Sequence, residues 1–420
     1  MQISAWDDEL RSFVDELCGF ESTAGNEAPA QEWIREYLSD AGFETYRWDA
    51  DTEVLAGHPS FPDDSDEIET ADRPSVAGVL EFGDPGAGRT LVLNGHVDVV
   101  PTGSGWKGDP FEPRWVDDAG AAGRLVARGA ADMKAGLATC VFAARHLAAS
   151  EPDVDGRLVV ESVVGEEEGG IGAAAAAIEN PYPFSRDAAI VAEPTECRPV
   201  TATEGSVMKR LRLEGRSAHA ASRWRGESVL PRFERIRRAF EDLEAERAER
   251  VSHPLYEEFP ISWPVCFGRV EAGRWASSVP DRLEAEVRIG VAPGETVAEV
   301  EREFEERLAA VVAEDSFLES HPPTFERFSI QFEPAETDAD EPVVRAVQSA
   351  MADAGLEDTD VRGATYGADS RHYVRAEIPT VLFGPGTVDQ AHFPEESIAW
   401  EEVLTAGEVL AAAAQAYLAG

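Results

Sequence analysis

The stretch Thr90-Leu-Val-Leu-Asn-Gly-His-Val-Asp98 places a histidine and an aspartate directly after an apolar segment. Residues 90–95 suit a buried parallel strand, and open α/β sheets place ligand sites at the carboxyl ends of such strands. Side chains two residues apart on an extended segment point the same way. Asp98 can therefore hold the imidazole of His96 while the other ring nitrogen faces a metal. Taken alone, the His-x-Asp pair suits a structural role equally well.

Strands and helices alternate around this segment, which indicates an α/β sheet with both faces covered. The hydrophobic periodicity predicts helices at 6–20, 28–41, 134–149 and 171–179, and strands at 76–82, 90–95, 157–164 and 188–192. We expect a loop without structure at 49–73 and a long loop that ends at 123. Near the C-terminus we predict a helix at 341–354, a strand near 379–383 and a final helix at 400–418.

The middle of the chain follows a different order. We predict strand 206–214, helix 228–248, strands 261–270 and 275–291, helix 296–314 and strand 325–333. This βαββαβ order is the ferredoxin-like pattern. The sequence therefore predicts one α/β domain, residues 1–205 and 336–420, interrupted by an inserted domain at 206–335.

The overall charge excludes some classes of partner. The 420 residues include 81 Asp and Glu against 37 Lys and Arg, which gives a formal net charge of −44. Nucleic acid and anionic membranes are poor partners for such a surface. Lysine occurs at Lys107, Lys134 and Lys209 only. An acidic surface poor in lysine is typical of a protein adapted to a cytoplasm with molar salt, where screening removes most of the repulsion between surface charges.

Cysteine usage and the N-terminus bear on the compartment. The four cysteines lie far apart without a Cys-x-x-Cys pair, so neither a disulfide framework nor a thiolate zinc site is indicated. The N-terminus is acidic, and no stretch approaches 18 uninterrupted apolar residues. We therefore expect a cytoplasmic protein.

Further acidic residues and a second histidine follow predicted strands and turns. Asp132 precedes an apolar helix, where it could equally be an N-cap. Glu166-Glu167-Glu168 ends one strand and could be a solvated acidic loop, Glu193 ends another, and His392 follows a Gly-rich turn. Crowded carboxylates repel one another unless a cation or solvent offsets the repulsion. Together, two histidines and several carboxylates without a thiolate indicate a two-metal hydrolytic centre.

At this point the sequence resembles the metal-dependent M20 peptidases and amidohydrolases. This family includes acetylornithine deacetylase, succinyl-diaminopimelate desuccinylase, aminoacylase and glutamate carboxypeptidases. The resemblance runs over nearly the whole chain and rests on six motifs in order: Gly95-His-Val-Asp98, Gly129-Ala-Ala-Asp-Met-Lys134, Gly165-Glu-Glu-Glu-Gly169, Glu193-Pro-Thr195, Gly215-Arg-Ser-Ala-His219 and His392. It implies a zinc-peptidase-like catalytic domain with a central mixed sheet, and an inserted domain that serves as a dimerisation domain and lid.

The resemblance also implies roles for individual residues. Asp132 would bridge two Zn²⁺ ions per subunit, with Co²⁺ or Mn²⁺ as possible substitutes. His96 and Glu193 would complete one ion site, and Glu167 and His392 the other. Glu166 would be the general base that takes a proton from the attacking water and passes it to the leaving amine.

His219 would act across a homodimer, reaching the partner's active site and stabilising the oxyanion. On its own, His219 equally resembles an ordinary surface histidine.

The match departs from the common pattern in the inserted domain. Ser277 stands where many members have an Asn, and Arg288 lies about two residues early, with Gly290 in the usual Arg place. These features, together with Gly367-Ala-Asp-Ser-Arg371, resemble the acetylornithine deacetylase-like branch. Arg288 and Arg371 are candidates for binding a substrate α-carboxylate, because a guanidinium binds it bidentately, although either could be a surface ion pair.

The leading hypothesis for function is hydrolysis of an N-acyl amino acid, foremost N-acetyl-L-ornithine. Within the same class, succinyl-diaminopimelate desuccinylase and dipeptidase or carboxypeptidase activities stay open, because all share the sequence around the ligands. An inactive binding relative would be expected to lose the base or a ligand, whereas Glu166 and the five ligand positions are all present. A structural acidic protein without metal predicts no stabilisation by Zn²⁺.

Overall fold

The segment that begins at residue 90 forms the middle of a mixed sheet in the computed structural model, which describes residues 3–62, 64–116 and 122–420. β3 (Arg89–His96) lies between β6 (Gly156–Val163) and β7 (Ala188–Val191) and is parallel to both. Along the sheet the strand order is β1-β2-β6-β3-β7-β15-β8-β13, and β14 pairs with β8. The remaining strands are β1 (Glu44–Trp48), β2 (Ser75–Phe82), β8 (Val200–Thr203), β13 (Ala335–Glu336), β14 (Arg362–Ala364) and β15 (Thr380–Leu382).

Both faces of this sheet are covered by helices, and side chains that alternate along each strand are buried on either side. On β3, Leu91 and Leu93 pack into one hydrophobic core and Val92 into another on the opposite face. The first core includes residues of α1 (Asp7–Cys18), α2 (Ala28–Asp40), α4 (Ala135–Ala149), α9 (Pro342–Asp353) and α11 (Trp400–Ala419). Residues of α5 (Ile171–Ile178) and α10 (Ser370–Arg375) join the second core. The carboxyl end of β3 is therefore held rigidly from both sides.

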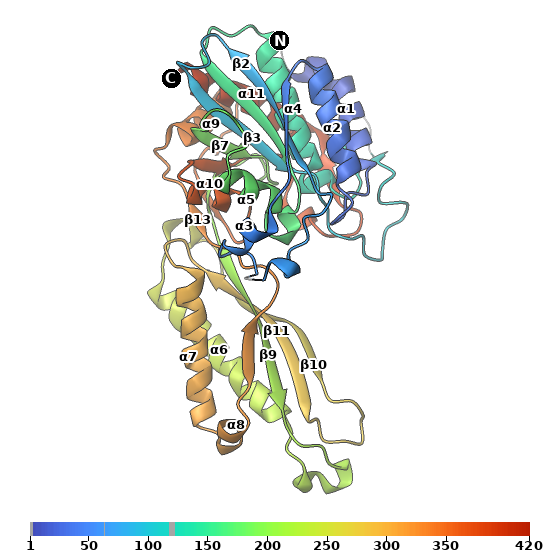
Figure 1. The fold of residues 1–420 in the computed structure, drawn as a ribbon, viewed down its shortest axis with the longest axis vertical. Coiled ribbons are helices and arrows are strands. Elements are labelled where there is room, and N and C mark those ends of the chain that lie inside the picture. The colour runs from blue at the N-terminus through green and yellow to red at the C-terminus, as the bar shows by residue number, and fades with distance from the viewer. Residues whose placement is uncertain (1–2, 63, 117–121) are drawn as a thin grey trace.

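The middle of the chain forms a second lobe, drawn below the first in Figure 1. Its antiparallel sheet has the order β10-β11-β9-β12. Its elements are β9 (Gly205–Glu214), α6 (Leu230–Arg250), β10 (Val265–Ala272), β11 (Arg282–Val291), α7 (Val297–Ala313), α8 (Ser316–Ser320) and β12 (Thr324–Arg327). Alternate residues of β9 and β11 pack against α6 and α7 in one core.

The predicted fold class, an α/β sheet interrupted by a βαββαβ unit, is confirmed. The domain boundaries at 205/206 and 335/336 stay a prediction. Within the described residues, no helix is both long and apolar enough to cross a membrane.

The chain passes between the lobes twice, and the two passages are hydrogen-bonded to each other. Ser206, at the start of β9, exchanges two backbone hydrogen bonds with Phe332. Phe332 lies between β12 and β13, and Gln331 beside it donates its backbone N–H to the Ser60 carbonyl of the first lobe at 2.9 Å. These contacts set the position of the second lobe over the sheet edge where β3 ends.

Several predicted boundaries were wrong. The 49–73 segment contains α3 (Thr52–Ala56) and the short 3-10 helix η2 (Ser65–Glu67), because Leu55, Phe61 and Ile68 are buried in a small core against α5. The strand expected at 275–291 begins at 282, and the one expected at 325–333 ends at 327 because the chain then returns to the first lobe. A small three-stranded sheet was also missed, made of β4 (Arg114–Val116), β5 (Arg124–Val126) and β16 (Ser397–Ala399). The long loop expected up to 123 includes 117–121, which lie outside the described residues.

Candidate metal centre

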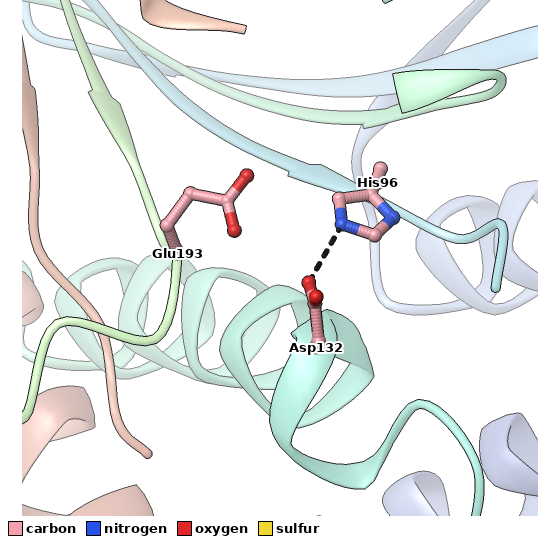
Figure 2. A group of neighbouring side chains, drawn as sticks. All are labelled: His96, Asp132 and Glu193. Atoms are coloured by element: carbon pink, nitrogen blue, oxygen red, sulfur yellow. Dashed lines mark hydrogen bonds and ion pairs between the residues drawn. The ribbon is translucent and has the colours of Figure 1, made fainter. Parts of the chain in front are cut away.

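Three segments far apart in the sequence bring His96, Asp132 and Glu193 together (Figure 2). His96 is the last residue of β3, and Glu193 follows β7. Asp132 lies in the turn η4 (Ala130–Lys134) that precedes α4, where its own backbone is not helical. One potential ligand atom from each lies within 4.8 Å of the others. The Nε2 atom of His96 is 3.1 Å from Oδ1 of Asp132.

A second group of three shares Asp132 and adds Glu167 and His392. Its ligand atoms also lie within 4.8 Å of one another. Nε2 of His392 is 3.1 Å from Oε1 of Glu167 and 3.6 Å from Oδ2 of Asp132. Asp132 thus directs one carboxylate oxygen toward each group. The arrangement suits two neighbouring ions bridged by a single carboxylate.

Backbone and side-chain groups around the ligands hold them in place. Nδ1 of His96 is 2.9 Å from the backbone carbonyl of Asp98, and 3.6 Å from its carboxylate. A proton on Nδ1 leaves the Nε2 lone pair free for a metal. The Asp98 carboxylate instead accepts backbone N–H groups of Glu166 at 3.2 Å and Glu167 at 3.1 Å. Asp98 therefore orients the His96 ring as expected, but through its backbone carbonyl, because its carboxylate points toward the loop that carries Glu166 and Glu167.

Sequence reasoning missed Glu396, which holds the loop that carries Asp132. The buried Glu396 carboxylate accepts the backbone N–H groups of Gly129 at 3.0 Å, Ala131 at 2.8 Å and Asp132 at 3.1 Å. It also accepts a hydrogen bond from Arg128 at 2.7 Å. The sequence carries no local sign of this role. Glu396 stands next to another glutamate, Glu395, and lies more than 260 residues after Asp132.

The electrostatics of the centre favour bound cations. Burial, reinforced by the nearby Glu193 and Asp369 carboxylates, raises the pKa of Glu166 well above its usual range. Burial also raises the pKa of Glu193 well above its usual range, opposed by His96. Divalent ions offset such repulsion, and imidazole and carboxylate ligands suit Zn²⁺, Co²⁺ and Mn²⁺. The residues present therefore fit a dinuclear centre, and they do not select among these metals.

A cavity of about 290 Å³ opens onto the centre. Its lining comprises Asp132, Glu166, Glu167, Glu193, Pro194, Ser206, Arg288, Phe332, Tyr366, Gly367, Val388, Ala391 and His392. The candidate base thus lies beside both ligand groups. The lining also includes Arg288 of the second lobe, which the sequence predicted, and Ser206 and Phe332 from the two passages between the lobes, which it did not.

Of the other predicted site residues, only Arg288 lines this cavity. Arg288 lines the cavity, but Arg371 does not: it is buried, stacks over the Phe332 ring at 4.2 Å and donates to the Ala368 carbonyl at 2.8 Å. His219 and Ser277 belong to neighbouring loops of the second lobe, where Ala220 N–H donates to the Ser277 carbonyl at 2.9 Å. These loops follow β9 and β10, at the lower tip of the molecule in Figure 1. Within one chain, neither His219 nor Ser277 lines the described cavity.

Comparison with known proteins places this geometry in a class of metal-dependent hydrolases. Residues 92–416 match the sequence profile of Peptidase family M20/M25/M40. An N-formyl-4-amino-5-aminomethyl-2-methylpyrimidine deformylase of Halalkalibacterium halodurans is 28% identical, over 94% of this chain and 91% of that protein. An acetylornithine deacetylase of Erwinia tasmaniensis is also 28% identical, over 73% of this chain and 75% of that protein.

The structural comparison agrees on the fold. A dinuclear metal-binding peptidase of the M20 family from Bacillus subtilis superimposes with a TM-score of 0.65 at 14% identity, covering 99% of each chain. The chain belongs to Peptidase family M20/M25/M40. It is thus a metal-dependent enzyme that acts on amide bonds, as the sequence predicted.

Proposed function

We propose that this chain is a deacylase that hydrolyses the amide bond of small N-acyl amines at a dinuclear centre formed by His96, Asp132, Glu193, Glu167 and His392. The observation that carries the proposal is the double ligand group that shares Asp132, with Glu166 on the wall of the same cavity. When bound, the ions polarise the scissile carbonyl and lower the pKa of water, so that hydrolysis proceeds near neutral pH.

The chain's own residues supply the proton transfers. Glu166 lines the cavity without belonging to either ligand group, so its carboxylate is free to take a proton from the attacking water and deliver it to the leaving amine. Asp98 positions Glu166 by accepting its backbone N–H. His96 and Glu396 both hold Asp132: the imidazole of His96 contacts its carboxylate, and the Glu396 carboxylate accepts its backbone N–H.

Two substrates deserve testing first. N-acetyl-L-ornithine is the substrate favoured by the sequence motifs, and the acetylornithine deacetylase relative supports it. The N-formyl aminomethylpyrimidine is favoured by a relative that matches along nearly the whole of both chains. Both reactions break an N-acyl bond and release an amine, so the same centre serves either.

We further propose that the enzyme is a homodimer in which His219 completes the partner's site. The loops around His219 expose two large aromatic side chains, Trp224 at 76% and Trp275 at 73%. Exposed aromatic rings are enriched in protein interfaces. This role requires an approach between subunits, because His219 does not line the cavity of its own chain.

The experiment that tests the function measures amine release by Zn²⁺-loaded protein in molar KCl. The substrates are N-acetyl-L-ornithine, the N-formyl aminomethylpyrimidine, succinyl-diaminopimelate and dipeptides. Thermal melting with and without Zn²⁺ accompanies it, since a ligand at a hundred times its Kd stabilises by about 2.7 kcal/mol. We expect a Zn²⁺-dependent rise in Tm and turnover of an N-acyl amine. A protein that melts at the same temperature with and without Zn²⁺, Co²⁺ and Mn²⁺ would contradict the metal centre.

A matched pair of histidine variants locates that effect. His392→Ala should weaken the Zn²⁺-dependent rise in Tm, because it removes one of the candidate ligands. His253→Ala removes a histidine outside both ligand groups, whose Nε2 lies 3.1 Å from Oε1 of Glu336, and it should retain the rise. Equal shifts in both variants would place the binding of Zn²⁺ elsewhere.

A further inference from the structure

Arg288 reaches the cavity with its charge already paired. Its Nη1 donates to Oε1 of Glu204 at 3.0 Å and its Nη2 donates to the Thr365 carbonyl at 3.1 Å. Glu204 is fully buried, and within the described residues Arg288 is its one ion-pair partner. A buried carboxylate this close offsets most of the field that the guanidinium exerts in the cavity.

The backbone around Glu204 is shaped to keep this pair together. Arg288 and Gly290 lie two residues apart on β11, so a side chain at 290 would point to the same face as Arg288. A Cβ at Gly290 would lie only 2.4 Å from Oε1 of Glu204. The Glu204 carboxylate therefore occupies the space that any side chain at 290 would need. A glycine at this point is a condition for the Glu204–Arg288 pair.

Within one chain, the charges that line the cavity leave no net positive site for an anion. Arg288 is the one arginine or lysine among the lining residues, all of which the structure describes. Asp132, Glu166, Glu167 and Glu193 line the same space, and their negative charges offset those of two divalent ions. With Arg288 paired, a substrate carboxylate beside the scissile amide would enter without a free counter-charge, which carries a large desolvation cost.

We propose that Glu204 is a specificity residue that, by neutralising Arg288, selects N-acyl amines without a carboxylate next to the scissile amide. The proposal rests on the deacylase function above and narrows its substrate class. The preferred substrates are then N-acyl derivatives of neutral or cationic amines, in place of N-acyl amino acids. A purely structural Glu204, joining the lobes through Arg288, predicts no effect on the choice between the two.

The test compares two ligands that differ only in the carboxylate, N-acetyl-L-ornithine and N-acetylputrescine. Calorimetry at pH 8 measures their affinities for Zn²⁺-loaded Glu166→Ala protein, in which slow turnover permits binding measurements. The same measurements are made with Glu204→Gln, Glu204→Asp and Glu204→Gln/Arg288→Met added. Glu286→Gln is the matched control, since it removes a glutamate from an ion pair with Arg210 at 2.9 Å on β11, the strand that carries Arg288. Thermal melting checks that each variant folds.

We expect N-acetylputrescine to bind more tightly than N-acetyl-L-ornithine. Glu204→Gln should shift the ratio of the two affinities toward N-acetyl-L-ornithine by about tenfold, which corresponds to ~1.4 kcal/mol. Glu204→Asp, which keeps the charge, and Glu286→Gln should retain the original ratio, and the added Arg288→Met should cancel the shift. Kinetics in the active background should show the same change in KM rather than kcat.

Three results would overturn the proposal, and they distinguish the role of Glu204 from the deacylase function. If Glu204→Gln leaves the ratio of the two affinities unchanged, Glu204 has no role in specificity. The same holds if the protein with Glu204 intact prefers N-acetyl-L-ornithine. Either result leaves the deacylase function standing. If protein that holds both ions binds neither ligand, small N-acyl amines are not its substrates. That result excludes the proposed substrate class and the specificity role of Glu204 together.

Discussion

Glu166 and Glu168 are separated by one residue, and their surroundings assign them different tasks. Glu166 is buried on the cavity wall, whereas Glu168 is 45% exposed and ion-paired with Arg73 at 2.6 Å. General acid–base catalysis contributes a factor of roughly 10²–10⁴ to a rate. We therefore expect Glu166→Gln to lower kcat by about this factor while both ions stay bound. Metal content by atomic absorption and amine release measure the two effects.

The matched control at residue scale is Glu168→Gln. This variant removes an adjacent carboxylate that lies outside both ligand groups, so we expect it to retain most of the turnover. A Glu166→Gln protein with the kcat of the unmodified enzyme would exclude Glu166 as the base.

A pH dependence follows from the surroundings of Glu204. Burial raises the pKa of Glu204 to about 7, opposed by Arg288 and, more weakly, by Arg247, while Tyr256 is the other titratable neighbour. As pH falls through 7, Glu204 gains a proton and loses its negative charge, while Arg288 stays positive. The affinity for N-acetyl-L-ornithine relative to N-acetylputrescine should therefore rise between pH 8 and pH 6. Calorimetry at both pH values checks this, and Glu204→Gln should abolish the change in the ratio.

Single residues differ in how much the sequence reveals of them. His96, Asp132 and Glu193 stand out because each follows a predicted strand or turn, in the order of a known set of motifs. Glu396 and Glu204 do not, because their roles depend on groups that only the tertiary fold brings within hydrogen-bonding distance. In a chain this acidic, a glutamate with a structural or specificity role cannot be distinguished by residue type from one that is solvated.

At the scale of elements, the Glu396 carboxylate, close to the C-terminal helix, fixes the backbone of the loop before α4 that carries Asp132. Removing one partner from a buried charged pair costs about 3–5 kcal/mol, and loss of groups that orient ligands costs about 10–100-fold in metal affinity. Glu396→Ala should therefore lower stability and Zn²⁺ affinity together, because it frees Arg128 and the backbone before Asp132. Denaturant unfolding and competitive Zn²⁺ titration measure the two losses.

Glu395→Ala is the control for this element. Glu395 is partly exposed and accepts hydrogen bonds from Arg114 and the Lys107 backbone, and surface pairs of this kind contribute up to about 1 kcal/mol. We expect a small loss of stability and an unaltered Zn²⁺ affinity. Equal effects of the two substitutions would show that Glu396 has no special hold on the Asp132 loop.

Long elements could be predicted and short ones could not. The helices at 135–149 and 400–419 and the strands at 89–96 and 156–163 lie within a few residues of their predicted bounds, because each carries a sustained apolar pattern. β8, β13, β14 and β16 have two to four residues each, too few to show a period, and are held by pairing with distant strands. The passage at 328–334 looked like strand because it is partly apolar, yet its apolar side chains pack against the first lobe, with Ile330 beside Gly169 and Phe332 beside Gly367.

At the scale of the whole molecule, the position of His219 defines a test of the homodimer. Its loop lies at the end of the second lobe away from the metal centre, so a catalytic role requires a second subunit (Figure 1). His219→Ala should keep metal content and fold but lower kcat, by up to the 10²–10³-fold typical of a lost oxyanion-stabilising group. Because Glu166→Ala is defective at a different position, subunit exchange between the two variants creates hybrid dimers with one intact composite site.

The mixture of these two variants should therefore be more active than either alone, approaching about a quarter of the unmodified activity at equal amounts and random exchange. Sedimentation analysis in molar KCl establishes whether the protein is dimeric before mixing. The control mixes Glu166→Ala with Glu166→Gln, whose hybrids lack the base in both sites and should stay inactive. Dimers that exchange subunits without recovering activity would exclude His219 from the partner's site, and a monomer with full activity would exclude the dimer from catalysis.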